Sequence, residues 1–210
     1  MRHRLFALFL IAPALAACEK TEPVATTTVE ETAGAEGPEE KVQLDGTTPG
    51  DLIPMFTASG TTGGKPAAVA SQTPGAVTVY CVGSTTCPTT KQYAAKLREI
   101  ETGYAPKGVQ FVWLYSNRAE SDEEKTAWHA EKGLAGVFVI DRDAAIAKAL
   151  GAERTPELVL TAANGTITYR GAIDDGSGDP KRATIEYLRN ALDATLAGKP
   201  VEVSVTVPDG

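Results

Sequence analysis

The order of apolar and polar positions predicts alternating strands and helices from about residue 45 onward. Three continuous apolar runs are rich in β-branched and aromatic residues, which is typical of strands buried on both faces of a parallel sheet. These runs are AVTVYCV (76–82), VQFVWLY (109–115) and VFVI (137–140). Two more strands, over 157–161 and 166–171, flank Asn164-Gly165, a dipeptide that favours the tight turn of a β-hairpin.

Helices are predicted over 88–101, 121–132, 143–150 and 181–197. In the first of these, Tyr93, Leu97 and Ile100 recur at helical spacing and share one face. Ser121 and Glu124 form the pattern of a capping box at the start of the second. The resulting order, β-α-β-α-β-α-β-β-α, predicts an α/β fold. We expect a mostly parallel central sheet with helices on both faces and a C-terminal antiparallel hairpin at its edge.

The N-terminal segment has a different character. A basic Arg2-His3-Arg4 region precedes the apolar run 5–17, which is shorter than the roughly 20 residues of a membrane-spanning helix. Residues 1–17 are therefore predicted to be a signal peptide. The run closes on Leu15-Ala16-Ala17-Cys18, which resembles the lipobox of bacterial lipoproteins. That resemblance implies a lipid on Cys18 and an exported protein anchored to a bacterial membrane, on its periplasmic or cell-surface side. A plain secretory signal is the alternative.

The remaining segments follow from composition. Residues 18–44 comprise Cys18 and a stretch rich in Thr, Glu, Ala and Pro, which predicts a disordered acidic tether. Residues 45–200 carry the strand and helix pattern and form one predicted domain, and residues 201–210 follow as a tail.

Charge and ligand residues exclude several classes of function. The chain has a net charge of −7, whereas a surface that binds nucleic acid needs a basic excess. If Cys18 carries a lipid, only Cys81, Cys87 and His129 remain beyond the leader as sulfur or imidazole ligands, too few for a structural zinc site. We therefore expect no metal, no cofactor and no nucleic-acid partner.

Cys87 stands at a junction where a thiol becomes reactive. It follows the strand 76–82 by five residues and directly precedes Pro88, a residue favoured at the first helical position. We expect Cys87 at the N-cap, where unpaired N–H groups and the helix dipole lower the pKa of a thiol. Cys81, inside the apolar run, is predicted to be buried and inert, with a role as resolving partner of Cys87 as the alternative.

Four segments spread over residues 49–200 carry a family resemblance. They are GDLIPMF (50–56), STTCPT (84–89), the helix-strand-helix over 121–150, and Arg154-Thr155-Pro156. Together they resemble the thioredoxin-like redoxins of the alkyl hydroperoxide reductase/thiol-specific antioxidant family. In that family the peroxiredoxins carry Thr/Ser-x-x-Cys-Pro-Thr, and the superfamily has a cis-proline where Pro156 stands.

The resemblance implies a role for each matching residue. Cys87 would be the nucleophile that attacks a peroxide or a disulfide, and Ser84 would hydrogen-bond the thiolate or the bound peroxide. Arg154 would stabilise the thiolate and the leaving oxygen. An external thiol or a thioredoxin-like protein would supply electrons. The groove for substrate or partner would be lined by Pro88, Thr155 and Pro156.

Departures from the family pattern keep several functions open. Thr90 stands where dithiol reductases of this fold carry the second cysteine of Cys-x-x-Cys, and Tyr80 replaces the proline of peroxiredoxins. The favoured hypothesis is a thiol-dependent, peroxidase-like oxidoreductase with antioxidant activity and one reactive cysteine, Cys87. The alternatives are a Cys81–Cys87 couple that exchanges disulfides and a non-catalytic binding module that keeps the thioredoxin fold.

Three other features receive structural interpretations. His129 lies on the charged helix 121–132, where we expect a solvent-exposed residue and not a base. The segment DDGSGDP (174–180) is interpreted as a turn and helix start in preference to a calcium site. GTTGGK (60–65) lacks the preceding strand and following helix of a phosphate-binding loop.

Overall fold

The computed structural model describes residues 47–72, 75–208 and 210. The predicted signal peptide, Cys18 and the tether up to residue 44 lie outside the described residues, and their assignments stay predictions. No helix in the described part of the chain is long and apolar enough to cross a bilayer.

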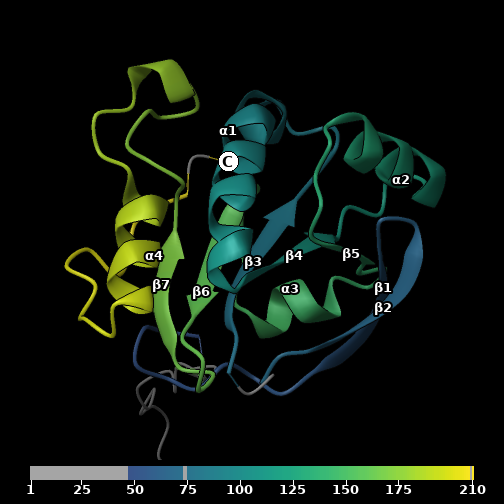
Figure 1. Cartoon of the computed structure of the whole chain (residues 1–210). Coiled ribbons are helices and arrows are strands. Elements are labelled where there is room, and N and C mark those ends of the chain that lie inside the picture. The colour runs from purple at the N-terminus through teal and green to yellow at the C-terminus, as the bar shows by residue number, and fades with distance from the viewer. Residues whose placement is uncertain (1–46, 73–74, 209) are drawn as a thin grey trace, which may run out of the picture. The chain divides into compact units, whose positions relative to one another are not determined.

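One mixed sheet forms the centre of the fold (Figure 1). Its strands are β1 (Thr57–Thr62), β2 (Lys65–Ala70), β3 (Val77–Gly83), β4 (Val109–Tyr115), β5 (Val137–Ile140), β6 (Glu157–Thr161) and β7 (Ile167–Gly171). Their order across the sheet is β2-β1-β5-β4-β3-β6-β7. The predicted buried strands β3, β4 and β5 pair in parallel, while β6, β7, β1 and β2 join antiparallel. The predicted α/β class and the C-terminal hairpin are confirmed.

Four α-helices accompany the sheet: α1 (Pro88–Tyr104), α2 (Asp122–Glu131), α3 (Ala145–Ala149) and α4 (Tyr187–Leu196). Short 3₁₀ helices occupy η1 (Ala105–Lys107) and η2 (Pro180–Arg182). The predicted capping box is present, because Ser121 and Glu124 each accept a hydrogen bond from the other's backbone N–H. Tyr93, Leu97 and Ile100 are all buried on one face of α1, as their spacing predicted.

The predicted start of the last helix at 181 is wrong, because α4 begins only at Tyr187. The Asp175 carboxylate accepts hydrogen bonds from the backbone N–H groups of Thr184 and Ile185. These bonds hold the chain between η2 and α4 outside helical geometry, and Ala183 has extended backbone angles. Asp179 accepts a hydrogen bond from the N–H of Lys181 at the start of η2.

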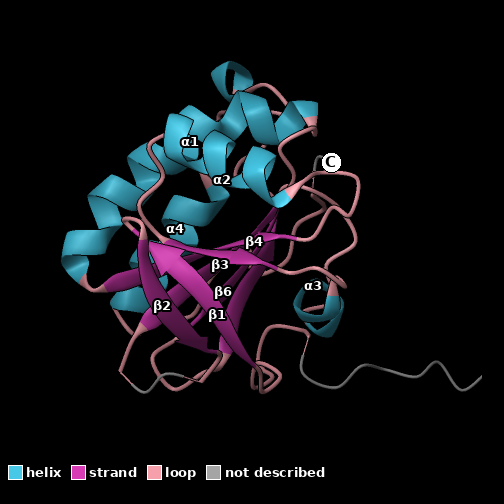
Figure 2. Ribbon diagram, turned by 90° about the vertical axis from the view of Figure 1, so that its right-hand side faces the viewer, coloured by secondary structure: helices cyan, strands magenta, loops and turns pink. Residues whose placement is uncertain are grey.

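Helices lie on both faces of the sheet, as predicted (Figure 2). On one face, α1 and α4 pack on the central strands, and Trp128 of α2 packs against the same core. On the other face, α3 contributes Ala147 to a second core that also contains Ile53 and Val69. The sheet is therefore buried on both sides, which explains why its central strands lack alternation.

The predicted solvent exposure of His129 is wrong. This side chain is only 8% exposed, and its Nδ1 forms a hydrogen bond of 3.0 Å with the Tyr115 hydroxyl. Its ring also packs edge-on against Trp113. Burial lowers the pKa of His129 to about 4, so the imidazole is neutral and belongs to the core.

The hairpin β1–β2 accounts for the glycine-rich segment 60–65. Gly63 and Gly64 have positive φ angles of 54° and 75° and form its turn, a conformation that glycine adopts readily. Gly60 allows β1 to approach β5, because a Cβ there would lie 2.4 Å from the Phe138 carbonyl oxygen. The segment therefore serves to extend the sheet.

Candidate active site

Cys87 is the N-cap residue of α1, as predicted. Its backbone is extended (φ −67°, ψ 122°), Pro88 is the first helical residue, and the Cys87 carbonyl accepts a hydrogen bond from Lys91 N–H. Because β3 ends at Gly83, a loop of three residues carries the chain from the sheet to this thiol. Cys87 as a residue is partly exposed.

The loop before β6 closes one side of the thiol. The Thr155–Pro156 peptide bond is cis, and the Thr155 carbonyl oxygen accepts a hydrogen bond of 3.0 Å from Cys87 Sγ. The two residues are 68 positions apart in sequence. They meet because β6 pairs directly with β3, with Val82 opposite Glu157.

The environment of Cys87 favours its thiolate. Burial by itself would raise the pKa of the thiol, but hydrogen bonds from the Thr155 side chain, from Thr90 and from the backbone of Thr89 outweigh this, so the pKa lies below its ordinary value. The Thr155 carbonyl is an acceptor and stabilises only the protonated thiol; hydroxyl and N–H donors stabilise the thiolate. The Thr90 hydroxyl is buried and bonds to no other group in the described part of the chain, so it is free to donate.

The Ser84 side chain is hydrogen-bonded to the Glu120 carboxylate. Its hydroxyl donates a short hydrogen bond to Glu120, and among the described residues no hydrogen bond joins Ser84 to Cys87. Glu120 Oε1 also accepts from Thr86 N–H (2.9 Å), from the Thr86 hydroxyl (2.9 Å) and from Asn117 Nδ2 (3.0 Å). This carboxylate is thus the common acceptor for the loop that presents Cys87.

Glu120 was missed by sequence reasoning. It is only 5% exposed, and burial alone would raise its pKa. The hydrogen bonds from Ser84 and Thr86 outweigh burial and lower the pKa to about 2, so Glu120 is ionised at neutral pH. The available signal was position: Glu120 follows the end of β4, and the carboxyl ends of parallel neighbours such as β3 and β4 meet at one edge of a sheet.

Arg154 lies in the same region as Ser84 and Thr155. All three line a pocket of about 290 Å³ together with Asn117 and Ser116. The Arg154 guanidinium is exposed and donates a hydrogen bond of 3.2 Å to the Gly210 carbonyl oxygen. The groups that lower the pKa of Cys87 are threonines, so the predicted electrostatic role of Arg154 stays a prediction.

Cys81 is buried in the core, as expected. Its side chain is 2% exposed on β3, and burial, assisted by the charge of Glu101, raises the pKa of its thiol. Both Cys81 and Cys87 are free thiols. Among the described residues, no three His, Cys, Asp or Glu side chains cluster as metal ligands would. Asp174, from the segment considered for calcium, forms a salt bridge with Lys96.

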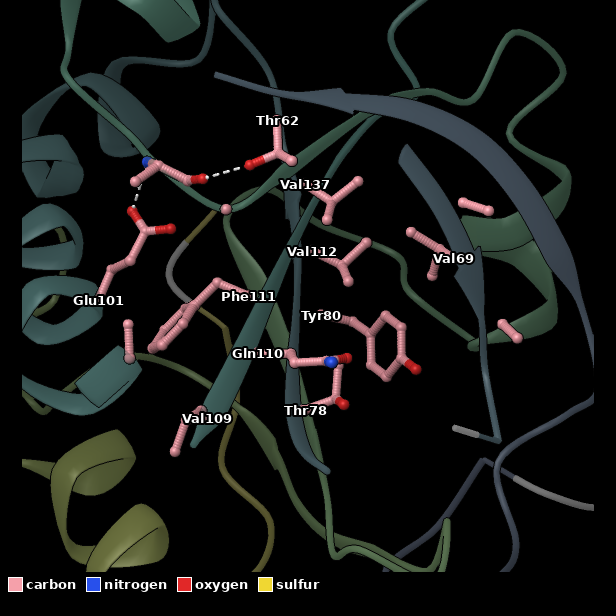
Figure 3. Close-up of a pocket in the computed structure, with 15 residues that line it drawn as sticks. Thr62, Val69, Thr78, Tyr80, Glu101, Val109, Gln110, Phe111, Val112 and Val137 are labelled. Carbon is pink, nitrogen blue, oxygen red and sulfur yellow. Dashed lines mark hydrogen bonds between the residues drawn. The ribbon is translucent and has the colours of Figure 1, made fainter. Parts of the chain in front are cut away.

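A separate pocket of about 330 Å³ lies between the hairpin β1–β2 and the strands β3 and β4 (Figure 3). Its walls include Tyr80, Val112 and Val137. At one end, Glu101 accepts a hydrogen bond from the Ala135 N–H group. The Ala135 carbonyl oxygen in turn accepts a hydrogen bond from the Thr62 hydroxyl. Neither thiol lines this pocket, so it is not part of the redox site.

The sheet order and the cysteine at a helix N-terminus beside a cis-proline loop define a thiol redox protein of thioredoxin-like fold. Residues 48–188 match the family model for redoxins, and the chain belongs to the redoxin family. A comparison with curated proteins finds no match.

Solved structures agree with this assignment. An uncharacterized conserved protein from Geobacillus kaustophilus is 30% identical, with a TM-score of 0.66 over 74% of this chain and 85% of that chain. A hypothetical protein from Sinorhizobium meliloti is 28% identical, with a TM-score of 0.66 over 77% and 92%. A structure named as a thiol:disulfide interchange protein, DsbE, from Chlorobium tepidum is 17% identical (TM-score 0.58; 70% and 97%) and shares the fold. The family and the fold support a thiol-dependent oxidoreductase.

Proposed function

We propose that this redoxin is a peroxidase-like enzyme that works with Cys87 alone. The observation that carries the proposal is the thiol at the N-terminus of α1, whose pKa is lowered by hydrogen bonds. Thr90 occupies the position at which a second cysteine would complete a dithiol motif, so the first oxidation product of Cys87 is not resolved within that motif.

The proposed cycle begins with attack of the Cys87 thiolate on one oxygen of a peroxide. An S–O bond forms and the O–O bond breaks, the leaving oxygen takes a proton, and the sulfur is oxidised by two electrons to a sulfenic acid. An external thiol then attacks the sulfenic sulfur, releases water and forms a mixed disulfide with Cys87. A second external thiol reduces this disulfide and regenerates the thiolate.

Burial argues against Cys81 as the resolving thiol. Its side chain packs in the same core as Tyr93 and Leu97, and its thiol has a raised pKa. A bond to Cys87 would require Cys81 to leave that core, at a cost of order 1–3 kcal/mol for the vacated space. An external thiol or a thioredoxin-like donor is the proposed reductant.

The proposed location follows from the N-terminal sequence. Residues 1–17 would be removed as a signal peptide, and Cys18 would carry a lipid that anchors the protein to the exported side of a bacterial membrane. External thiols and peroxides reach that compartment by diffusion.

The test compares Cys87→Ser with Cys81→Ser in the full chain. Hydrogen peroxide consumption with dithiothreitol as reductant should be lost in the first variant and retained in the second. Mass spectrometry after peroxide exposure in the presence of dimedone should place the sulfenic acid adduct on Cys87. If wild type consumes no peroxide and carries no adduct, the peroxidase is excluded. Reduction of a protein disulfide without peroxide consumption would favour disulfide exchange, and neither activity would favour a binding module.

A further inference from the structure

The segment that follows α4 is built into the sheet. Arg170 N–H donates to the Ser204 carbonyl (3.0 Å), and Thr206 N–H donates to the Arg170 carbonyl (3.1 Å). Val205 thereby pairs in parallel with Arg170 of β7. Because β7 is the last strand of the sheet, this segment covers an edge that would otherwise offer unpaired backbone groups. We call residues 204–208 and Gly210 the strap.

Thr206 fixes the strap in place. Its hydroxyl shares a hydrogen bond of 2.6 Å with the Tyr169 hydroxyl and accepts one of 2.8 Å from Ala172 N–H. Gly171 makes room for it, because a Cβ at this position would lie 2.2 Å from Thr206 Oγ1. These contacts hold the strap at one defined position on β7.

The end of the strap, Gly210, lies at the redox site. Gly210 packs on the backbone of Thr155, so closely that a Cβ on Gly210 would lie 2.0 Å from the Thr155 carbonyl oxygen. The Gly210 carbonyl accepts the hydrogen bond from Arg154. The same Thr155 oxygen accepts the hydrogen bond from Cys87 Sγ. Cys87 Sγ and Gly210 thus both lie against the Thr155 carbonyl group.

We propose that the strap occupies the surface on which a polypeptide redox partner docks, and that it must move before a bulky disulfide reaches Cys87. The inference rests on the proposed function only in that Cys87 is the exchanging thiol. The docking surface comprises the backbone of Thr155, the guanidinium of Arg154 and the free edge of β7. Its partner is an extended segment with a small residue at the Gly210 position and a carbonyl group facing Arg154. Small molecules such as peroxide approach Cys87 without strap movement.

The exchange step that reports on the strap is balanced without a further reactant. The Cys87 thiolate attacks one sulfur of a disulfide, a new S–S bond forms, and the other sulfur leaves as a thiolate. Oxidised glutathione serves as the bulky peptide disulfide, and iodoacetamide serves as the small reagent. Both reagents require the same thiolate, so the ratio of their rates measures access and is independent of the thiol pKa.

The decisive variant is Gly210→Ala, whose Cβ has no room on Thr155. Gly103→Ala is the matched control, because a Cβ at Gly103 of α1 meets no atom within 4 Å. Modification of Cys87 is followed in the full chain by peptide mass spectrometry. We expect the ratio of the glutathione rate to the iodoacetamide rate to rise about tenfold in Gly210→Ala, as loss of one charge-assisted hydrogen bond would allow. Gly103→Ala should leave the ratio unchanged.

A second variant ends at Thr206, which keeps the hydroxyl that bonds to Tyr169 and Ala172. It should show the same higher ratio, because it lacks Gly210, which packs on the Thr155 backbone. The strap proposal is overturned if both variants keep the wild-type ratio. A Cys87 that reacts with neither reagent except at the pH of an ordinary thiol would instead overturn the proposed function, while the ratio still decides the role of the strap.

Discussion

Glu120→Gln tests whether an ionised carboxylate holds the loop that carries Cys87. The substitution keeps the size of the side chain but removes its charge, and it places an amide group where Glu120 Oε2 is buried without a partner among the described residues. Glutamine can accept some of the hydrogen bonds from Ser84 and Thr86 but cannot match an ionised acceptor. We expect a less stable protein and a looser loop.

The magnitude follows from the pKa of Glu120, which is lowered from 4.5 to about 2. Each tenfold preference for the ionised form corresponds to about 1.4 kcal/mol, so ionised Glu120 stabilises the folded state by up to about 3 kcal/mol. Because the folded-state pKa is the lower one, this stabilisation is fully present above the unfolded-state value of 4.5. It is lost as the pH falls from there through 2, and at pH 3 roughly half should remain.

Urea unfolding of wild type and Glu120→Gln, followed by circular dichroism, measures the difference directly. Near neutral pH the variant should lose about 2–3 kcal/mol of unfolding free energy, and this loss should shrink by roughly half at pH 3. The control is Glu123→Gln, an exposed carboxylate three residues away, which should change stability by less than about 0.5 kcal/mol. The reasoning is refuted if the loss is the same at both pH values, or if the control matches the variant.

Two further predictions concern the thiol and the anchor. Thr90→Val should raise the pKa of Cys87, because it removes a hydroxyl that can donate to the thiolate. The midpoint of iodoacetamide alkylation against pH should then move to higher pH, while Thr90→Ser should keep the wild-type midpoint; equal midpoints for all three would exclude the hydroxyl. Cys18→Ala should abolish lipid attachment when the full sequence is expressed in a bacterium, so that the protein leaves the detergent phase or stays unprocessed. A wild-type protein that is soluble, cleaved elsewhere and unmodified at Cys18 would contradict the anchor.

The features that sequence reasoning predicted correctly depend on local interactions. Cys87 could be placed at the start of α1 because Pro88 prefers the first helical position and a continuous apolar run ends a few residues before it. The capping box at Ser121 and the turn at Asn164-Gly165 likewise depend on neighbours within four residues. The predicted start of the last helix was wrong because the Asp175 carboxylate accepts a hydrogen bond from the backbone N–H of Thr184, nine residues away. No local pattern reports such a bond.

What surrounds Cys87 was decided by the tertiary structure. The α/β class and a thiol at a helix N-terminus could be predicted from local patterns, because hydrophobic periodicity and helix capping act over a few residues. Only the strand order β4-β3-β6 brings Glu120 to Ser84 across 36 positions and Thr155 to Cys87 across 68. Gly210 reaches Thr155 because the strap pairs with β7, which lies beside β6. Such contacts arise from the packing of distant strands at one edge of the sheet, and residue spacing along the chain does not encode them.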